Sequence, residues 1–140
     1  MLVRVTGWVL RISALLALIL GILLWVSVLP DSSAPIHMLL GIIVVLSLIV
    51  LAVAFGTSKG GNWGLAGGAI VLALIVAGFG GSQQTILPTD NVHWIIQVIH
   101  LILGLAAIGM GEAIAGIAIT NASTPSIPPV TNGEDGPLRA

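Results

Sequence analysis

The sequence has no cysteine and very few charged residues. Without cysteine the chain has no disulfides, no thiolate metal sites, no iron–sulfur clusters and no haem attached covalently through a CxxCH motif. Charged residues make up 6% of the chain and hydrophobic residues 57%, whereas soluble domains contain about 25% charged residues. The formal net charge of -1 gives no reason to expect binding to nucleic acid. The composition therefore predicts a membrane protein.

Four apolar runs, separated by short segments of proline, glycine and polar residues, precede a polar tail. About 20 apolar residues suffice for a helix to cross a bilayer. The first run is longer than the apolar region of a signal peptide, so we interpret it as a retained span. The pattern predicts an all-α, four-helix transmembrane bundle with up-down-up-down topology and spans at about residues 8–29, 36–55, 63–80 and 92–119. The tail, residues 121–140, is rich in Pro, Ser and Thr, and we expect it to be disordered.

The few charges predict an orientation. If the N-terminus is cytoplasmic, the outer loops carry only Asp31 and Asp90, and the cytoplasmic side carries Arg4, Arg11, Lys59 and Arg139. Because positive residues gather on the cytoplasmic side of membrane proteins, we expect both termini to be cytoplasmic. The sequence thus predicts an integral protein embedded in a lipid bilayer, and we expect that bilayer to be a bacterial cytoplasmic membrane.

The last apolar run, residues 91–120, is unusual because it contains polar side chains. Ionisable groups inside a membrane span are costly and usually have a partner or a function. At 100° per residue, one stripe of this helix carries His93, Gln97, His100, Gly104, Ala107 and Gly111. Lipid cannot satisfy the polar groups of this stripe, so we expect the stripe to face protein or a cofactor.

The second and fourth runs share a short pattern around a histidine. Residues 36–41 read IHMLLG and residues 99–104 read IHLILG. In the predicted topology these two helices run parallel, so both histidine segments point in the same direction across the membrane. The pattern is compatible with an old duplication of a helix pair, and also with chance, because glycine is common in membrane helices.

Histidine is the only strong ligand for haem iron in this chain, and three are present. A four-helix bundle can hold a haem between histidines of two helices. Gly41 and Gly104, one turn after His37 and His100, leave room for a wide, flat macrocycle. The arrangement resembles the small membrane b-type cytochromes, which are four-helix haem proteins with bis-histidine ligation. The resemblance implies one haem b with His37 and His100 as its axial ligands.

Two further polar residues have several interpretations. His93, beside Trp94 at the membrane boundary, could hydrogen-bond a haem propionate, bind a quinol or replace His100 as the ligand. Gln97, one turn from both histidines, is expected to form a hydrogen bond between helices. A plainer alternative remains for all three histidines, since those near helix ends often sit at the interface or bond to neighbouring backbone.

Arg11 and Glu112 are predicted to form an ion pair. Counted from the outer ends of their helices, the two residues lie at depths that agree to about 3 Å at 1.5 Å per residue. Pairing keeps both charges near the inner boundary at a tolerable cost. We expect a structural connection between the first and fourth helices in preference to a proton relay.

Three functions are compatible with these residues. The first is a haem b electron-transfer protein or subunit that exchanges electrons with quinol or with an outer-face redox partner. We expect an electron carrier or subunit in preference to a stand-alone enzyme. The second is a non-catalytic structural or pigment-binding subunit of a larger respiratory or photosynthetic membrane complex. In the pigment-binding form, a histidine ligates a chlorophyll. The partners are other subunits of the complex or further copies of this chain in a homo-oligomer. The third is a small transporter or proton channel that uses His93, His100 and Glu112.

Overall fold

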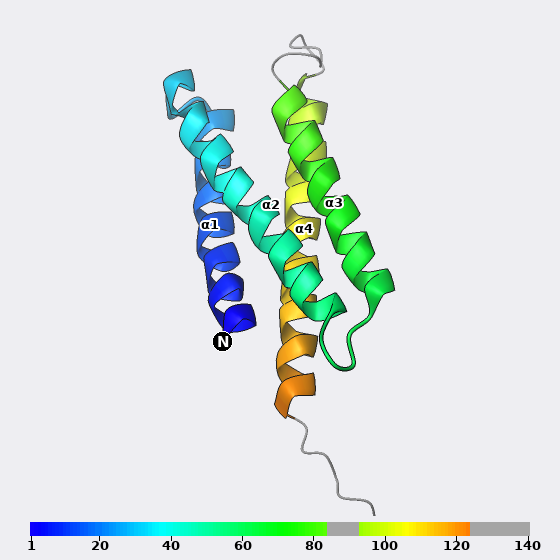
Figure 1. Cartoon of the computed structure of the whole chain (residues 1–140). Coiled ribbons are helices and arrows are strands. Elements are labelled where there is room, and N and C mark those ends of the chain that lie inside the picture. Colours follow the sequence, from blue (N-terminus) through cyan, green and yellow to red (C-terminus); the bar gives the residue numbers. More distant parts are fainter. Residues whose placement is uncertain (84–92, 124–140) are drawn as a thin grey trace, which may run out of the picture.

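The computed structural model describes residues 1–83 and 93–123. Within these residues the chain forms four long helices, α1 (Leu2–Trp25), α2 (Ala34–Gly56), α3 (Trp63–Ser82) and α4 (His93–Ser123), and a short 3-10 helix, η1 (Asp31–Ser33). Each long helix is long and apolar enough to cross a membrane. The helices alternate in direction, so α2 and α4 run parallel (Figure 1). The predicted all-α four-helix bundle is confirmed.

The first helix lies earlier in the chain than predicted. It begins at Leu2 instead of residue 8, and residues 2–7 contain no proline that would interrupt it. It ends at Trp25, four residues before the predicted end, where Ser27 adopts a left-handed φ of 56°. The amide of Val28 donates to the Leu23 carbonyl at 2.9 Å, which is the closing bond of a Schellman cap.

The start of α3 has a side-chain cause, and the last described turn of α4 makes a side-chain contact with the turn before α3. The Asn62 Oδ1 atom accepts hydrogen bonds from the amides of Gly64 and Leu65, at 2.8 and 3.1 Å, and thereby caps α3. Helix α4 continues three residues into the predicted disordered tail, where Asn121 Nδ2 donates to the Gly60 carbonyl at 3.2 Å. Gly60 has a φ of 78°, which few other residues adopt. The rest of that tail, residues 124–140, lies outside the described residues.

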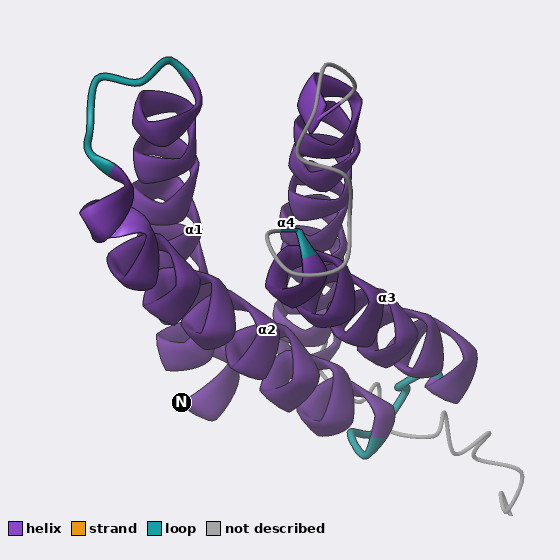
Figure 2. Ribbon diagram, turned by 90° about the horizontal axis from the view of Figure 1, so that it is seen from above, coloured by secondary structure: helices purple, strands orange, loops and turns teal. Residues whose placement is uncertain are grey.

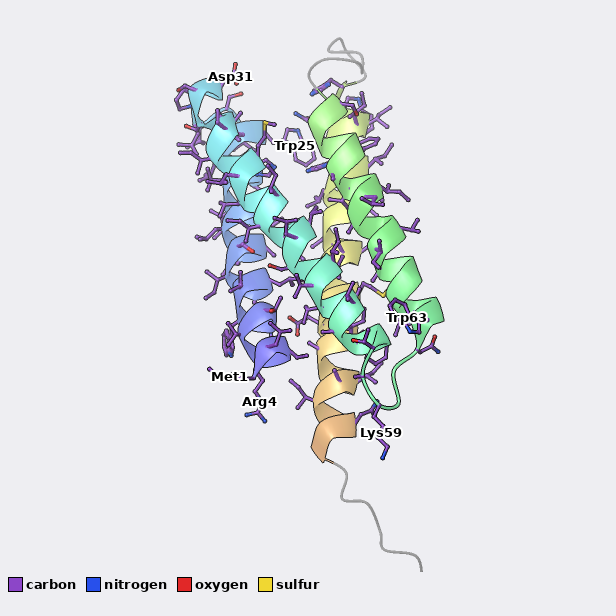
Figure 3. The ribbon with its side chains drawn as sticks, viewed as in Figure 1. Met1, Arg4, Trp25, Asp31, Lys59 and Trp63 are labelled. Atoms are coloured by element: carbon purple, nitrogen blue, oxygen red, sulfur yellow. The ribbon has the colours of Figure 1, made fainter. Side chains whose placement is uncertain are left out.

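The two ends of the bundle differ in packing. We name them after a labelled residue of each: the Met1 end, which also carries Lys59, and the Asp31 end (Figure 3). The buried core lies toward the Met1 end, and its largest side chains are Leu10, Leu48, Leu51, Phe55 and Ile114. Toward the Asp31 end no described residue of 15–43, 77–83 or 93–106 is buried.

The helices form two hairpins, α1 with α2 and α3 with α4, which lie side by side when seen from above (Figure 2). The hairpins converge toward the Met1 end and stand apart at the Asp31 end (Figure 1). Helices α2 and α4, the parallel pair, contact each other across the bundle, and α1 contacts α4. Any side chains that connect the hairpins at the Asp31 end therefore do so outside the buried core.

Candidate functional site

Two imidazole rings meet between the hairpins near the Asp31 end. His37 lies in the first turn of α2, and His100 lies two turns into α4. Their ring centroids are 6.1 Å apart, with an angle of 61° between the ring planes. Both residues are half-buried, in the part of the bundle that has no buried core. The two parallel helices thus bring together the histidines that the shared sequence pattern singled out.

The ring of His37 is held by α1. Its Nδ1 atom lies 3.0 Å from the Ala17 carbonyl oxygen. A carbonyl oxygen only accepts hydrogen bonds, so Nδ1 carries the proton and donates it, which leaves the Nε2 lone pair of the neutral ring free. Gly21 makes room for the ring, because a Cβ atom at this position would lie 3.0 Å from His37 Cε1. Such a hydrogen bond is the usual way in which proteins orient a metal-binding histidine.

The ring of His100 is held by α3. It stacks on Phe79, with ring centroids 6.3 Å apart and an angle of 13° between the planes. Gly80 makes room for it, because a Cβ atom there would lie 3.0 Å from His100 Cε1. The His100 Nδ1 atom is buried and has no hydrogen-bond partner. Because buried polar atoms nearly always have a partner, this nitrogen marks a place where a bound group would supply one.

The surroundings of the two histidines are alike. In each hairpin, the imidazole packs against a glycine of the preceding helix, Gly21 for His37 and Gly80 for His100. Adding 59 to the residue numbers of α1 aligns Gly21 with Gly80, and adding 63 to those of α2 aligns His37 with His100. The similarity between the hairpins therefore extends from the shared sequence pattern to the helix that precedes it.

The same alignment matches the buried core. It pairs buried residues with buried residues at seven positions: Gly7 with Ala66, Leu10 with Ala69, Ala14 with Ala73, Val44 with Ala107, Leu48 with Gly111, Leu51 with Ile114 and Ala52 with Ala115. Every other buried residue of the described chain aligns with a half-buried one. The two hairpins are thus equivalent in burial, and His37 and His100 occupy equivalent positions in them.

The structure also places the other residues of the predicted site. The imidazole that lies against His37 belongs to His100, whereas His93 is the first residue of α4 and is half-buried. Gln97 is half-buried, and no hydrogen bond of its side chain occurs within the described residues. Gly41 and Gly104 each have open space where a Cβ atom would stand.

The stripe of small residues on α4, Gly104, Ala107 and Gly111, is open only at Gly104, the residue nearest the Asp31 end. At Gly111 a Cβ atom would lie 2.8 Å from Leu10 Cδ1, so the α1 side chain fills this position. Ala107 is also buried, at 1% exposure. The open space beside His100 therefore does not extend to Ala107 and Gly111. A bound macrocycle would lie between these residues and the Asp31 end.

Arg11 and Glu112 form a two-pronged ion pair between α1 and α4. Arg11 Nε donates to Glu112 Oε1 and Nη2 donates to Oε2, each at 2.7 Å. The Arg11 guanidinium also lies 5.2 Å from the centre of a Trp8 ring. In the equivalent interface between α2 and α3, the same alignment places Ile70 and Ile49, which pack on the core. A polar contact and an apolar one thus occupy corresponding positions.

Four residues of the histidine site were missed in the sequence: Ala17, Gly21, Phe79 and Gly80. Both glycines stand near the end of the helix that precedes a histidine-bearing helix. In an antiparallel hairpin, such a residue lies at about the height of one just after the turn. Comparing heights across the turn would have selected Gly21, because His37 lies in the first turn of α2. It would not have selected Gly80, because His100 lies two turns into α4, and Ala17 contributes only its backbone carbonyl and leaves no signal.

The donor set suits a group that needs two nitrogen ligands. Within the described residues, no cluster of three or more His, Cys, Asp or Glu side chains is placed to hold a metal ion. Haem iron needs only two axial ligands from the protein, because the porphyrin supplies the others. A fixed Nε2 lone pair, an unpartnered buried nitrogen and two glycine cradles fit such a group. Comparison with protein-family models, curated proteins and solved structures found no match to this chain.

Proposed function

We propose that the protein is a membrane-embedded electron carrier, or a subunit of one, in which His37 and His100 bind one haem b. The observation that carries this proposal is the pair of imidazoles, 6.1 Å apart between centroids, in the half of the bundle that has no buried core. Elsewhere the helices bury small, aliphatic and aromatic side chains against one another. A flat apolar macrocycle at this place would supply the missing core.

The distance between the rings supports a shared metal ion. Imidazole nitrogen binds a metal ion such as zinc at about 2.0–2.1 Å, so two rings on opposite sides of one ion have centroids about 6 Å apart. The observed 6.1 Å agrees with this spacing. A chlorophyll needs one axial histidine, so two adjacent imidazoles favour haem over the pigment-binding alternative.

Different residues would orient the two histidines that hold the haem. The Ala17 carbonyl fixes the tautomer of His37 and aims its Nε2 lone pair away from that bond. Phe79 and Gly80 fix the plane of His100. When bound, haem b accepts and releases one electron at its iron.

The position of the site limits the route of electrons. Both histidines lie near the Asp31 end, and a single group there does not reach across a hydrocarbon core of about 30 Å. Exchange with a quinol or a redox partner therefore occurs on the Asp31 side, which we propose to be the outer face of a bacterial cytoplasmic membrane. The N-terminus and the end of α4 then lie on the cytoplasmic side.

The proposal is tested by visible spectroscopy of the purified protein, produced with haem supplied during expression. We expect a Soret band, with sharp bands on reduction, in the wild type and in His93→Ala. We expect its loss in His37→Ala and His100→Ala, because each removes one axial ligand. Far-ultraviolet circular dichroism checks that all variants remain helical, as expected for half-buried positions.

Three results would contradict the proposal. They are a wild type without a Soret band, a band that survives both single substitutions, and a band that only His93→Ala removes. A native preparation that carries chlorophyll in place of haem would instead support the pigment-binding subunit.

A further inference from the structure

A groove at the opposite end of the bundle has no role in the histidine site. It lies between α1 and α4 near the Met1 end and has a volume of about 310 Å³. Its lining combines arginines, an aromatic ring and small or apolar residues: Val3, Arg4, Gly7, Trp8, Arg11, Ala115 and Ile119. This combination of cationic and apolar groups matches an amphipathic anion.

Small residues open the groove. Gly7 and Ala115 are both buried where the two helices approach each other. A Cβ atom on Gly7 would lie 3.8 Å from the Ala115 Cβ atom, which is an ordinary contact distance. The helices are thus close together at the base, and the larger side chains of Val3 and Trp8 border the space above it.

The charge of the groove resides on Arg4. The Arg11 guanidinium is neutralised by Glu112 through two bonds of 2.7 Å, yet its Nη1 hydrogens remain available for another acceptor. Arg4 is exposed and forms no ion pair with any residue that the structure describes. The groove is therefore lined by one unneutralised guanidinium and, two helical turns further along α1, by a second one that still has donors to offer.

The place of the groove identifies the kind of anion. Arg4, Met1 and Lys59 all lie at one end of the molecule, and Asp31 lies at the other (Figure 3). Arg4 is in the first turn of a membrane-spanning helix, so its side chain reaches the level of the lipid headgroups. Basic pockets between membrane helices at this level bind the headgroups of anionic lipids.

We propose that this groove binds one anionic phospholipid. Arg4 and the free donors of Arg11 bind the phosphate, and an acyl chain lies along Val3 and the apolar base. Trp8, which is exposed at the same level, packs beside the headgroup region as interfacial tryptophans do. The site is independent of the proposed haem.

The test is native mass spectrometry of the protein in detergent, titrated with phosphatidylglycerol or with phosphatidylcholine. We expect the wild type to retain phosphatidylglycerol preferentially and Arg4→Gln to bind it about fivefold more weakly, because one cationic side chain is lost. Lys59→Gln is the matched control, since it removes an exposed charge at the same end but outside the groove. Arg4→Lys, which keeps the charge, should retain most of the binding.

Competition with inorganic phosphate distinguishes a lipid site from a site for free phosphate. We expect millimolar phosphate to leave the bound lipid in place, because it lacks the acyl chains that occupy the groove. The proposal is overturned if phosphate displaces the lipid, if Arg4→Gln binds as tightly as the wild type, or if Lys59→Gln loses as much binding. Circular dichroism of each variant confirms that the helices are intact.

Discussion

Gly78 and Gly80 belong to the same helix, α3, but have very different surroundings. A methyl group on Gly80 would press on the His100 ring, at 3.0 Å from Cε1, whereas one on Gly78 would meet nothing within 4 Å. Gly21 stands in the same relation to His37. At these positions, the absence of a side chain determines where an imidazole can lie. The glycines after the histidines, Gly41 and Gly104, contact nothing at this point and act only by leaving space.

This difference predicts opposite effects of one chemical change. Gly78→Ala should raise the free energy of unfolding by about 0.5–1 kcal/mol, because alanine favours a helix over glycine and meets no neighbour. Gly80→Ala should move the His100 ring and weaken haem binding while leaving the helices formed. Thermal unfolding in detergent and the absorbance ratio of haem to protein measure the two effects. Equal haem content in both variants would show that Gly80 does not position the ring.

The interfaces between helices show two solutions to one packing problem. Leu10 of α1 fills the space at Gly111 of α4. At the aligned positions, the small residue is Ala69 of α3 and the large one is Leu48 of α2. The exchange of large and small residues conserves volume across the two interfaces. The ion pair of Arg11 and Glu112 likewise aligns with Ile70 and Ile49, so one interface is polar where the other is apolar.

The alignment predicts that the ion pair can be replaced. Arg11→Ile/Glu112→Ile should assemble with a melting temperature equal to or above that of the wild type, because it copies the apolar interface. Each single substitution should lower the melting temperature, since it leaves one charge without its partner near lipid. Size-exclusion chromatography and thermal unfolding in detergent measure both. If the melting temperature of the double variant is as low as that of the single variants, an apolar contact cannot replace the ion pair between α1 and α4.

Glu112→Gln separates the structural role from a proton relay. A protein that stays assembled but loses a proton-coupled activity would favour the relay. Loss of assembly alone is the result expected of a structural connection.

The molecule as a whole is divided along its length. Among the described residues, the buried core, Arg4 and Lys59 lie toward the Met1 end, and the two adjacent histidines and Asp31 lie toward the other. Trp25 and Trp63 lie near opposite ends, as aromatic residues at the two interfaces of a membrane do (Figure 3). A single orientation in the membrane would place the histidine site and the arginine groove in different leaflets.

The absence of cysteine makes that orientation easy to test. Ser32→Cys introduces one thiol at the Asp31 end, and Ser58→Cys introduces one in the turn between α2 and α3. In intact cells, a maleimide that cannot cross membranes should label the first and not the second, because positive residues keep the Met1 end inside. Both should react after permeabilisation. The reverse pattern would contradict the proposed orientation and move the haem to the cytoplasmic side.

Much of the fold was predictable because it depends on local properties. Helix number, direction and approximate length follow from apolar runs and the residues that interrupt them. The predicted third span begins at residue 63, where α3 begins. The end of α1 was missed because a serine, and not a glycine, adopts the left-handed conformation at Ser27.

The inward face of each helix was not predictable in the same way. In lipid both faces of a helix are apolar, so hydrophobicity has little periodicity to indicate which side is buried. Ile102 is 59% exposed, whereas Ala107 on the same helix is 1% exposed. Polar residues were the exception, because only they are costly in lipid, and they alone led to Arg11, Glu112 and the histidines.

Length, hydropathy and charge are properties of single segments, so they were enough to predict a four-helix membrane protein and the few polar residues that need partners inside it. The close approach of His37 and His100, the glycines against their rings and the position of the buried core toward the Met1 end are visible only in the folded bundle. These depend on how helices distant in sequence approach each other. That approach is set by the fit of small and large side chains, which no single segment contains.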